Sequence, residues 1–467
     1  MTAAAIASAV GGHLQSGAAE RIFDGFSIDS RTLAAGDLFF AIVAARDGHA
    51  FVADALDRGA GGVVIQGDRL QDGVPGLMQG KSGTVLIQVD DTTAALQMLG
   101  RHVRRASKAT VVAITGSAGK TTTKETIAEF LSARYDVVKN RGNLNNHLGL
   151  PLSLLELRRG ADVAVMELGM NHAGEIRVLV SLSEPEVRVW INVGDAHIGF
   201  FESQDAIADA KAEILEHASE TDLLVCNADD NRVMRRAAAF AGRTVTFGIT
   251  ADADVRATRI DELGVDGMRV DVQTRHGAAE MRVPLLGRAN LANVLAAAAV
   301  ATELGVPLDE VALRAAALKP AHHRGAVVRL RNGVTVVDDS YNSSPAALRS
   351  ALQVIRREAR AARKAAVLGE MLELGEHSDR LHRECGEQAA AAGLDRLIAV
   401  GAAPAKALAE AAVAAGLSQA QVTWVDSSVA AAELIVDWLS PGDLVLVKGS
   451  RGIKTDQVVD RISTEFA

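Results

Sequence analysis

One segment of the sequence has the composition of a phosphate-binding turn. The apolar run Thr110–Ile114 predicts a buried strand, and it is followed by TGSAGKTTT and the helical sequence TKETIAEFL. A glycine-rich turn at a helix start directs backbone N–H groups and the positive dipole end at a phosphate, while lysine adds charge and threonine can bind magnesium. A plain surface turn would not need strand, Lys-Thr and helix in this order. The predicted phosphate-binding residues are Gly116, Ser117, Ala118, Gly119, Lys120, Thr121 and Thr122.

Carboxylates also follow predicted strands. Glu167 ends the strand Asp162–Met166, where it can hold magnesium, although a single glutamate at a strand end is usually solvated. Asp339 follows the buried strand Val334–Val337, and a carboxylate in that place can bind ribose hydroxyls. The nearby Tyr341 can face the reacting groups, as can Asn342.

The elements that must position these residues alternate between strands and helices. In the middle of the chain this order predicts a mostly parallel, doubly wound sheet, with phosphate loops at the carboxyl ends of its strands. Beyond Pro320 the alternation begins again, which predicts a Rossmann-like domain. The further predicted strands are Val187–Val193, Leu223–Asn227, Thr244–Gly248, Ala365–Leu368, Leu397–Val400 and Leu444–Val447, and the predicted helices include Thr92–Ala106, Ala346–Lys364 and Leu381–Ala392.

The length of 467 residues exceeds what one hydrophobic core holds. Short apolar runs from Phe39 to Val89 predict a small N-terminal α/β domain. We therefore predict an α/β protein of three domains: residues 1–92, residues 93–320 with the phosphate-binding segment, and the Rossmann-like residues 321–467.

The overall composition excludes several classes of protein. The net charge of -9 gives no broad basic surface, so nucleic-acid binding is not expected. The two cysteines, Cys226 and Cys385, are far apart and lack partners at zinc spacing, which fits a reducing cytoplasm. The apolar N-terminus has no positive flank, and no apolar run approaches the roughly 20 residues that span a bilayer. We expect a cytoplasmic protein without a membrane anchor.

Several motifs together resemble one family. The position of Ile114 carries a glycine in the commonest phosphate loops, and a TG-x-x-GKT loop without it resembles the Mur ligase and folylpolyglutamate synthetase superfamily. The segment DDSYNSSP at 338–345 most closely resembles the Mur ligases that add a dipeptide to a tripeptide precursor. Further similar segments are NRGNLNNHLGLP (140–151), DAHIGFFES (195–203), RANLAN (288–293), HHRG (322–325), GEMLELG (369–375), LVKGSR (446–451), DSR (29–31) and DGH (47–49). Three departures from the family pattern are Ala289 for histidine, His322-His323 for Pro-Gly and Ser344 for asparagine.

The resemblance implies roles for particular residues. It implies ATP contacts by Asn290 and Asn293, although Asn290 can instead cap its helix. Arg324 is expected to meet the nucleotide phosphates. The implied catalytic residues are Lys120, His197, Lys211, Asn145 and Asn146; the implied magnesium ligands are Thr121, Glu167, His197 and Lys211; the implied substrate contacts are Ser30, Arg31, Asp47, His49, Tyr341 and Asn342.

Lys211 is a special case. The resemblance implies that it is carbamylated, because a carbamate is a carboxylate-like anion that can sit beside magnesium, whereas an unmodified lysine would repel the ion. The surrounding sequence IADAKAEIL alone predicts an exposed helix lysine.

The implied reaction is the ATP- and Mg²⁺-dependent joining of D-alanyl-D-alanine to UDP-N-acetylmuramoyl-tripeptide by a monomer. The third residue of the peptide, diaminopimelate or lysine, stays open. A diaminopimelate-adding ligase would show D-N-P-R in its third domain, and a folylpolyglutamate synthetase would lack DDSYN. A P-loop kinase or NTPase would explain Gly116 to Thr121 and none of the other motifs.

Overall fold

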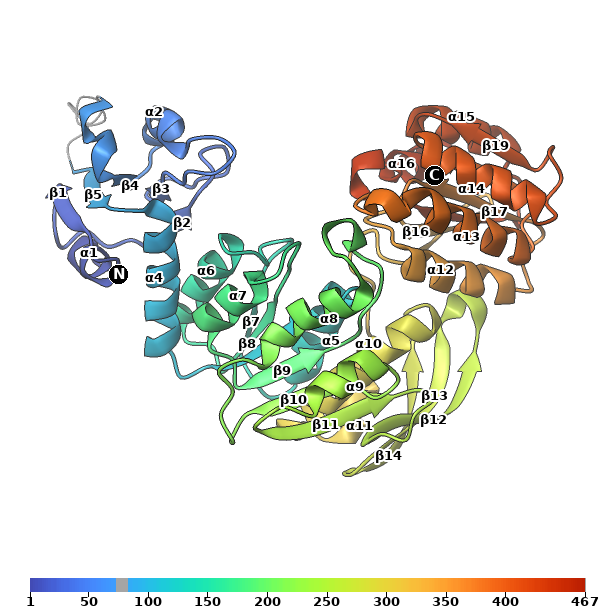
Figure 1. Ribbon diagram of the computed structural model, residues 1–467, viewed down its shortest axis with the longest axis horizontal. Helices are drawn as coiled ribbons and strands as arrows, with labels where there is room; N and C mark the ends of the chain where they lie inside the picture. The colour runs from blue at the N-terminus through green and yellow to red at the C-terminus, as the bar shows by residue number, and fades with distance from the viewer. Residues whose placement is uncertain (73–82, 467) are drawn as a thin grey trace. The chain divides into compact units, whose positions relative to one another are not determined.

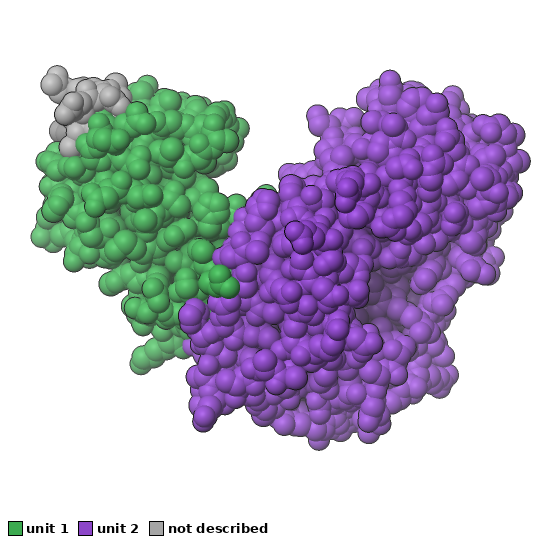
Figure 2. Space-filling view, in the orientation of Figure 1, with its two compact units in different colours: residues 1–111, 136–169, 177–185 green, residues 112–135, 170–176, 186–467 purple. Residues whose placement is uncertain are grey.

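The computed structural model describes residues 1–72 and 83–466 and divides into two compact units (Figure 2). The predicted α/β class is confirmed, because helices alternate with strands that form three sheets. The predicted domain boundaries near residues 92 and 320 stay a prediction, because the two compact units are divided at other residues. The first unit comprises Met1–Val111, Asp136–Gly169 and Arg177–Pro185, and the second comprises Val112–Tyr135, Met170–Ile176 and Glu186–Ala467.

A five-stranded sheet with the order β1-β5-β4-β3-β2 lies in the first unit (Figure 1, blue). Only β1 is antiparallel to its neighbour; the other neighbours are parallel. The apolar runs predicted as strands supply its core, in which Phe39, Val63 and Ile65 pack beside Ala55 of a short helix. The elements are α1 (Ala3–Ala9), β1 (His13–Ser16), β2 (Phe26–Ser27), β3 (Leu38–Phe40), η1 (Gly48–Phe51), α2 (Val52–Asp57), β4 (Gly62–Gln66), η2 (Gly67–Asp72) and β5 (Val85–Val89).

The predicted helix Thr92–Ala106 is confirmed as α4. It begins after Asp91, whose carboxylate accepts the N–H of Ala94 and thereby satisfies one of the free donors of the first turn. The guanidinium of Arg104 is buried near its end and donates to the carbonyl oxygen of Ser183 at 2.7 Å. The remaining elements of the first unit are the parallel strands β7 (Val137–Lys139) and β8 (Val163–Glu167), α6 (Gly149–Leu154) and η3 (Leu155–Arg159), and α7 (Glu175–Ser183) continues into it.

Seven neighbouring strands of the second unit follow the order β14-β13-β12-β11-β10-β9-β6 (Figure 1). The predicted parallel arrangement is confirmed for β6, β9, β10 and β11. The strand predicted to reach Val193 ends at Trp190, and the next residues turn toward the phosphate loop. These strands are β6 (Thr110–Thr115), β9 (Val187–Trp190), β10 (Leu223–Asn227), β11 (Arg243–Gly248), β12 (Val255–Glu262), β13 (Met268–Thr274) and β14 (Gly277–Val283).

The antiparallel strands β12 to β14 have no counterpart among the predicted elements. In β13 buried residues such as Val270 alternate with less buried ones such as Asp271, the pattern of a strand with one covered face. The alternation was present in MRVDVQT, but no motif marked the region.

The C-terminal sheet has the order β15-β16-β20-β17-β18-β19, parallel except for β15. It confirms the Rossmann-like prediction. The helix predicted to reach Lys364 ends instead at Arg357, so that prediction was wrong. Glu358 leaves the helix because its carboxylate accepts the backbone N–H groups of Val265 and Arg360. The strands are β15 (Ala326–Arg329), β16 (Thr335–Asp339), β17 (Lys364–Gly369), β18 (Arg396–Val400), β19 (Val422–Val425) and β20 (Leu444–Lys448).

The helices of the second unit pack on these two sheets. No helix within residues 1–72 and 83–466 has the length and apolar character to cross a membrane. The helices are α5 (Lys120–Leu131), η4 (Ile198–Phe200), α8 (Gln204–Ala212), η5 (Glu213–Leu215), α9 (Asn231–Ala237), η6 (Gly264–Asp266), α10 (Gly287–Glu303), α11 (Leu308–Ala315), α12 (Pro345–Arg357), η7 (Gly375–His377), α13 (Ser378–Ala391), α14 (Ala403–Ala414), α15 (Ser428–Trp438), η8 (Arg451–Ile453) and α16 (Asp456–Glu465).

Candidate active site

The predicted phosphate loop joins β6 to α5 as expected. Gly119 caps the N-terminus of α5 with φ at +86°, a conformation that L residues with a side chain rarely adopt. A Cβ at this position would lie 2.3 Å from Oδ1 of Asn293, so glycine is required for space as well. The loop and the predicted nucleotide residue Asn293 therefore lie against each other.

Residues that come after β9 form hydrogen bonds with the phosphate loop and stabilise its conformation. The side chain of Asn192 accepts the N–H of Ala118 at 3.0 Å and donates to its carbonyl oxygen at 3.1 Å. The Ser117 hydroxyl accepts the N–H of Gly194 at 2.9 Å. Sequence reasoning assigned no role to Asn192, because nothing local in the sequence shows that β9 lies beside β6.

Lys120 begins α5, and its ammonium donates to the carbonyl oxygen of Gly116 at 2.7 Å. The charge therefore lies over the loop, where the resemblance expects a phosphate. Thr121 and Thr122 occupy the same first helical turn. The geometry thus agrees with the predicted arrangement of these residues, while their contacts with a nucleotide stay a prediction.

Lys211 lies on α8 with only 1% of its surface exposed, so the exposed-lysine interpretation is wrong. Burial and repulsion from Lys120 lower the pKa of Lys211 well below its usual range. A neutral amine is the form that reacts with carbon dioxide. Carbamylation of this amine stays a prediction.

His197 is close to both lysines. Burial, then the charge of Lys120, lowers the pKa of His197, while Glu373 opposes this change. Nδ1 of His197 lies 2.7 Å from Oε2 of Glu373. Glu373 belongs to the GEMLELG segment, but no local pattern in the chain assigns it to the same site.

The two asparagines of α10 interact with each other. The Asn293 amide donates to Oδ1 of Asn290 at 3.2 Å, and the Asn290 amide donates to the carbonyl oxygen of Leu286 at 2.9 Å. Asn290 therefore does not cap the helix, because α10 begins after Leu286 without a side-chain cap, and its Oδ1 instead orients Asn293 toward the loop.

The predicted residues of the C-terminal sheet gather at its carboxyl edge. Lys448 donates to Asp339 at 2.6 Å and to the carbonyl oxygen of Asn342 at 3.0 Å. Burial raises the pKa of Asp339, and Lys448 and Arg324 oppose that change. The Arg324 guanidinium lies 4.1 Å from the centre of the Tyr341 ring.

Arg324 follows two histidines that stand where the family pattern has Pro-Gly. His323 has φ at +58°, a left-handed conformation that suits glycine, and its Nδ1 lies 2.6 Å from a carboxylate oxygen of Asp338. This contact holds the His323 ring against β16.

Three predicted polar residues of the first unit come after β7 or end β8. Glu167 is buried and accepts a hydrogen bond from the Asn145 amide at 2.9 Å. Asn146 is placed differently, because its Oδ1 accepts the N–H groups of Leu148 and Gly149 at the start of α6. Asn145 is thus beside the expected metal ligand, whereas the amide oxygen of Asn146 is used in capping.

A cavity of about 1030 Å³ lies in the first unit. Its lining includes both predicted substrate residues Ser30 and Arg31, together with Arg46 and Arg141. The Arg31 guanidinium is bound to Asp29 at 2.9 and 2.7 Å and lowers the pKa of that carboxyl to about 2. The lining of the cavity thus combines basic side chains with carboxylates, of which Asp29 already pairs with Arg31.

Asp47 and His49 do not line this cavity. His49 Nδ1 lies 2.6 Å from Asp47, and His49 Nε2 accepts the N–H of Gln66 at 3.0 Å. Both ring nitrogens are thus used within the protein, and the geometry favours a structural role in holding η1 against β4.

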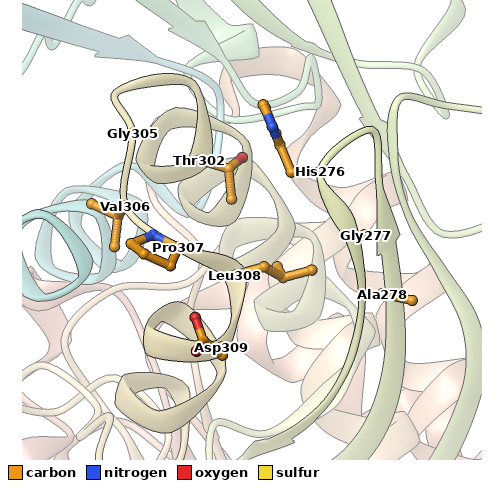
Figure 3. Close-up of a pocket in the computed structure, with 9 residues that line it drawn as sticks. All are labelled: His276, Gly277, Ala278, Thr302, Gly305, Val306, Pro307, Leu308 and Asp309. Atoms are coloured by element: carbon orange, nitrogen blue, oxygen red, sulfur yellow. The ribbon is translucent and has the colours of Figure 1, made fainter.

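Figure 3 shows a second cavity of about 450 Å³, where the β13–β14 turn faces the connection between α10 and α11. His276, Thr302 and Pro307 contribute to its lining. None of the predicted site residues belongs to it.

Two of the residues expected to bind magnesium, Thr121 and Glu167, suit that ion in type. Within residues 1–72 and 83–466 no group of three or more His, Cys, Asp or Glu side chains could hold a metal alone. Magnesium is usually held by one or two carboxylates and by substrate phosphates, keeping several waters. The Thr121 hydroxyl beside the phosphate loop and the Glu167 carboxylate, each described within its own unit, are oxygen donors of the appropriate kind.

The second unit combines a glycine-rich phosphate loop on a parallel sheet with a Rossmann-like sheet, and this defines a nucleotide-dependent α/β enzyme. The model of the Mur ligase middle domain matches residues 114–301, and that of the Mur ligase, glutamate ligase domain matches residues 323–451. The chain belongs to the Mur ligase family.

Individual relatives resemble nearly the whole chain. UDP-N-acetylmuramoyl-tripeptide--D-alanyl-D-alanine ligase of Escherichia coli (strain K12) is 34% identical over 98% of this chain and 97% of its own. The crystal structure of MurF from Acinetobacter baumannii is 30% identical, with a TM-score of 0.86 over 99% of this chain and 98% of that chain. MurF ligase from Thermotoga maritima in complex with ADP is 28% identical, with a TM-score of 0.79 over 95% and 97%.

Proposed function

We infer that the chain is an ATP-dependent ligase that joins D-alanyl-D-alanine to UDP-N-acetylmuramoyl-tripeptide in peptidoglycan synthesis. The observation that carries this inference is the full-length similarity to relatives with that activity in their names, such as the Escherichia coli ligase. The assembled phosphate loop and the DDSYN segment at the end of β16 agree with it.

In the proposed reaction the protein binds the substrates and stabilises the charge that develops during two chemical steps. In the first step a peptide carboxylate attacks the γ-phosphate of ATP, giving an acyl phosphate and ADP. Lys120, held over the loop, stabilises the charge that develops on the transferred phosphoryl group. The dipeptide amine then attacks the acyl carbon, loses a proton and displaces phosphate, which forms the amide.

Magnesium is proposed as the second requirement of this reaction. When bound, it neutralises phosphate charge beside the loop. Thr121 and Glu167 are the proposed protein ligands, and His197 and Lys211 are proposed to lie near it. Carbamylation of Lys211 is supported by the burial and lowered pKa of its amine. Lys211→Ala should lose most activity, and acetate or formate should restore part of it; no restoration would argue against a carbamate.

We propose the cytoplasm as the place of action, which agrees with the free, buried thiols of Cys226 and Cys385. The proposal also includes a monomer, which light scattering of the purified protein tests.

The activity is tested by following ADP release in the presence of ATP, magnesium and UDP-N-acetylmuramoyl-tripeptide. D-Alanyl-D-alanine should drive release, whereas L-alanyl-L-alanine, D-alanine, D-glutamate and diaminopimelate should not. Mass spectrometry of the product should show the amide-linked pentapeptide. Faster release with a single amino acid would indicate another Mur-type ligase, and ADP release without amide formation would indicate a kinase or NTPase.

A further inference from the structure

Two loops of the second unit meet beside Lys120. One contains His197 and η4, which come after β9, and the other contains Glu373 and η7, which come after β17. Nδ1 of His197 lies 2.7 Å from Oε2 of Glu373, and the N–H of Gly199 donates to the carbonyl oxygen of Glu373 at 3.0 Å. The contact therefore joins the sheet that carries the phosphate loop to the sheet that carries Tyr341.

The backbones of the two loops approach too closely for side chains. A Cβ at Gly199 would lie 2.6 Å from the nitrogen of Gly375, and a Cβ at Gly375 would lie 2.9 Å from Cα of Gly199. Two small residues at this crossing bring His197 and Glu373 within reach of each other.

Both interacting side chains come from unusual backbone conformations. Six non-glycine residues in the described part of the chain have positive φ, and His197 at +66° and Glu373 at +64° are two of them. Such conformations are strained and persist where the surroundings enforce them, often at functional sites. Because His197 and Glu373 both have such conformations and contact each other, we infer that the two loops are shaped to maintain this contact.

The contact also determines which nitrogen of His197 can carry a proton. Nδ1 is buried and has no hydrogen-bond partner among the described residues apart from its contact with Glu373. An ionised carboxylate only accepts hydrogen bonds, so it favours the tautomer with the proton on Nδ1. Nε2 then keeps its lone pair in a fixed direction.

We propose that Glu373 is a positioning residue of the ligase reaction, which holds the imidazole of His197 in one orientation and in the Nδ1-protonated tautomer. This role rests on the proposed function, because it serves the chemistry beside Lys120. Partners that orient a functional histidine typically contribute roughly 10- to 100-fold to activity. A purely structural role in joining the loops would lower stability without a selective loss of kcat.

Glu376 provides a matched control. It is a carboxylate of the same loop, its side chain is 89% exposed, and it contacts only the adjacent His377 among charged groups of the described chain. Glu376→Ala thus removes the same charge from the same element without touching His197.

Kinetics form the first half of the test. Glu373→Ala should lower kcat at least tenfold and change KM for ATP and for the dipeptide less than threefold, and Glu376→Ala should stay within twofold of wild type. Glu373→Gln, whose amide oxygen can still accept from Nδ1, should recover most of the lost kcat. Equal effects of Glu373→Ala and Glu376→Ala, or a rise in KM without loss of kcat, would overturn the proposal.

The second half of the test measures the tautomer of His197 directly by NMR. Long-range ¹H–¹⁵N spectra of histidine-labelled protein should show His197 protonated on Nδ1, with the signal assigned by its loss in His197→Gln. Glu373→Ala should populate the other tautomer, whereas Glu376→Ala should not; an unchanged tautomer in Glu373→Ala would overturn the proposal. This readout needs no turnover, so an enzyme without dipeptide-dependent activity would refute the proposed function separately.

Discussion

The phosphate loop of the second unit and the cavity of the first unit differ in the groups that surround their basic side chains. In the cavity, Arg31 is bound by both oxygens of Asp29, which stays ionised down to a pH of about 2. Beside the loop, burial first and then the charge of Lys120 lower the pKa of Lys211. The charge of Arg31 is balanced before a ligand arrives, whereas the surroundings of Lys211 disfavour a second positive charge beside Lys120.

This difference predicts different consequences for substitutions. A phosphate that enters the loop is met by Lys120 and by backbone N–H groups, so changes there should alter the chemical step and nucleotide binding. A ligand that enters the cavity meets groups already oriented by ion pairs. Changes there should weaken binding of one substrate and leave kcat nearly unchanged.

Lys120→Ala should have the largest effect. It removes the charge held over the loop, which should cost roughly 3 kcal/mol or more of transition-state stabilisation, or at least about 100-fold in kcat. Steady-state ADP release measures this, and circular dichroism checks that the variant is folded. Activity within tenfold of wild type would contradict the role of the loop.

Gly119→Ala should weaken ADP binding by roughly tenfold or more, because left-handed strain and the clash with Asn293 act together. Gly174→Ala is the matched control, since Gly174 has φ at +89° and open space where its Cβ would lie. Calorimetric titration of ADP should show the loss only in Gly119→Ala. Equal affinities in the two variants would mean that the contact with Asn293 does not shape the site.

Arg31→Ala should raise KM for the UDP-linked substrate about tenfold while kcat and KM for ATP change less than twofold. Arg105→Ala is the control, because Arg105 also pairs with a carboxylate of the first unit, Glu184, and neither residue lines the cavity. A fall in kcat in Arg31→Ala would contradict the contrast between the two regions, since it would place Arg31 in the chemical step.

The phosphate loop was predicted well because its function depends on consecutive residues. Strand, turn, Lys120 and helix are adjacent in the chain, so their types and order specify the geometry. Several strands of the parallel sheets were predicted for a similar reason, because they are largely apolar runs such as Leu223–Asn227. Features that depend on local residue order could therefore be predicted from the sequence.

Contacts between distant segments could not be predicted in this way. Asn192 supports Ala118 only because β9 lies beside β6, and Glu373 meets His197 only because two loops cross at glycines. The burial of Lys211 was missed because a lysine on a helix is normally exposed, and its burial depends on the tertiary packing of α8. These features depend on sheet order and packing, which no single segment encodes.

The smallest effect is expected on the free energy of unfolding, when the buried Lys211 is replaced. Its pKa is lowered in the folded protein, so below the unfolded pKa of about 10.5 the unfolded chain binds more protons at this residue. The contribution of Lys211 to the free energy of unfolding therefore rises with pH toward that value. Lys211→Met removes this dependence.

In nucleotide-free protein at neutral pH, Lys211→Met should therefore unfold at a higher temperature than the wild type. The difference in free energy should narrow as pH rises toward the pKa of the unfolded lysine, by at most about 1.4 kcal/mol per pH unit. Scanning calorimetry in buffers free of carbon dioxide measures it. If the difference in the free energy of unfolding between Lys211→Met and the wild type stays constant between pH 6.5 and 9, the amine of Lys211 stays charged in the folded protein or is modified. That result would remove the contrast with the balanced Arg31–Asp29 pair. Adding ADP and magnesium should stabilise the wild type, because a ligand that binds only the folded protein shifts the unfolding equilibrium toward it.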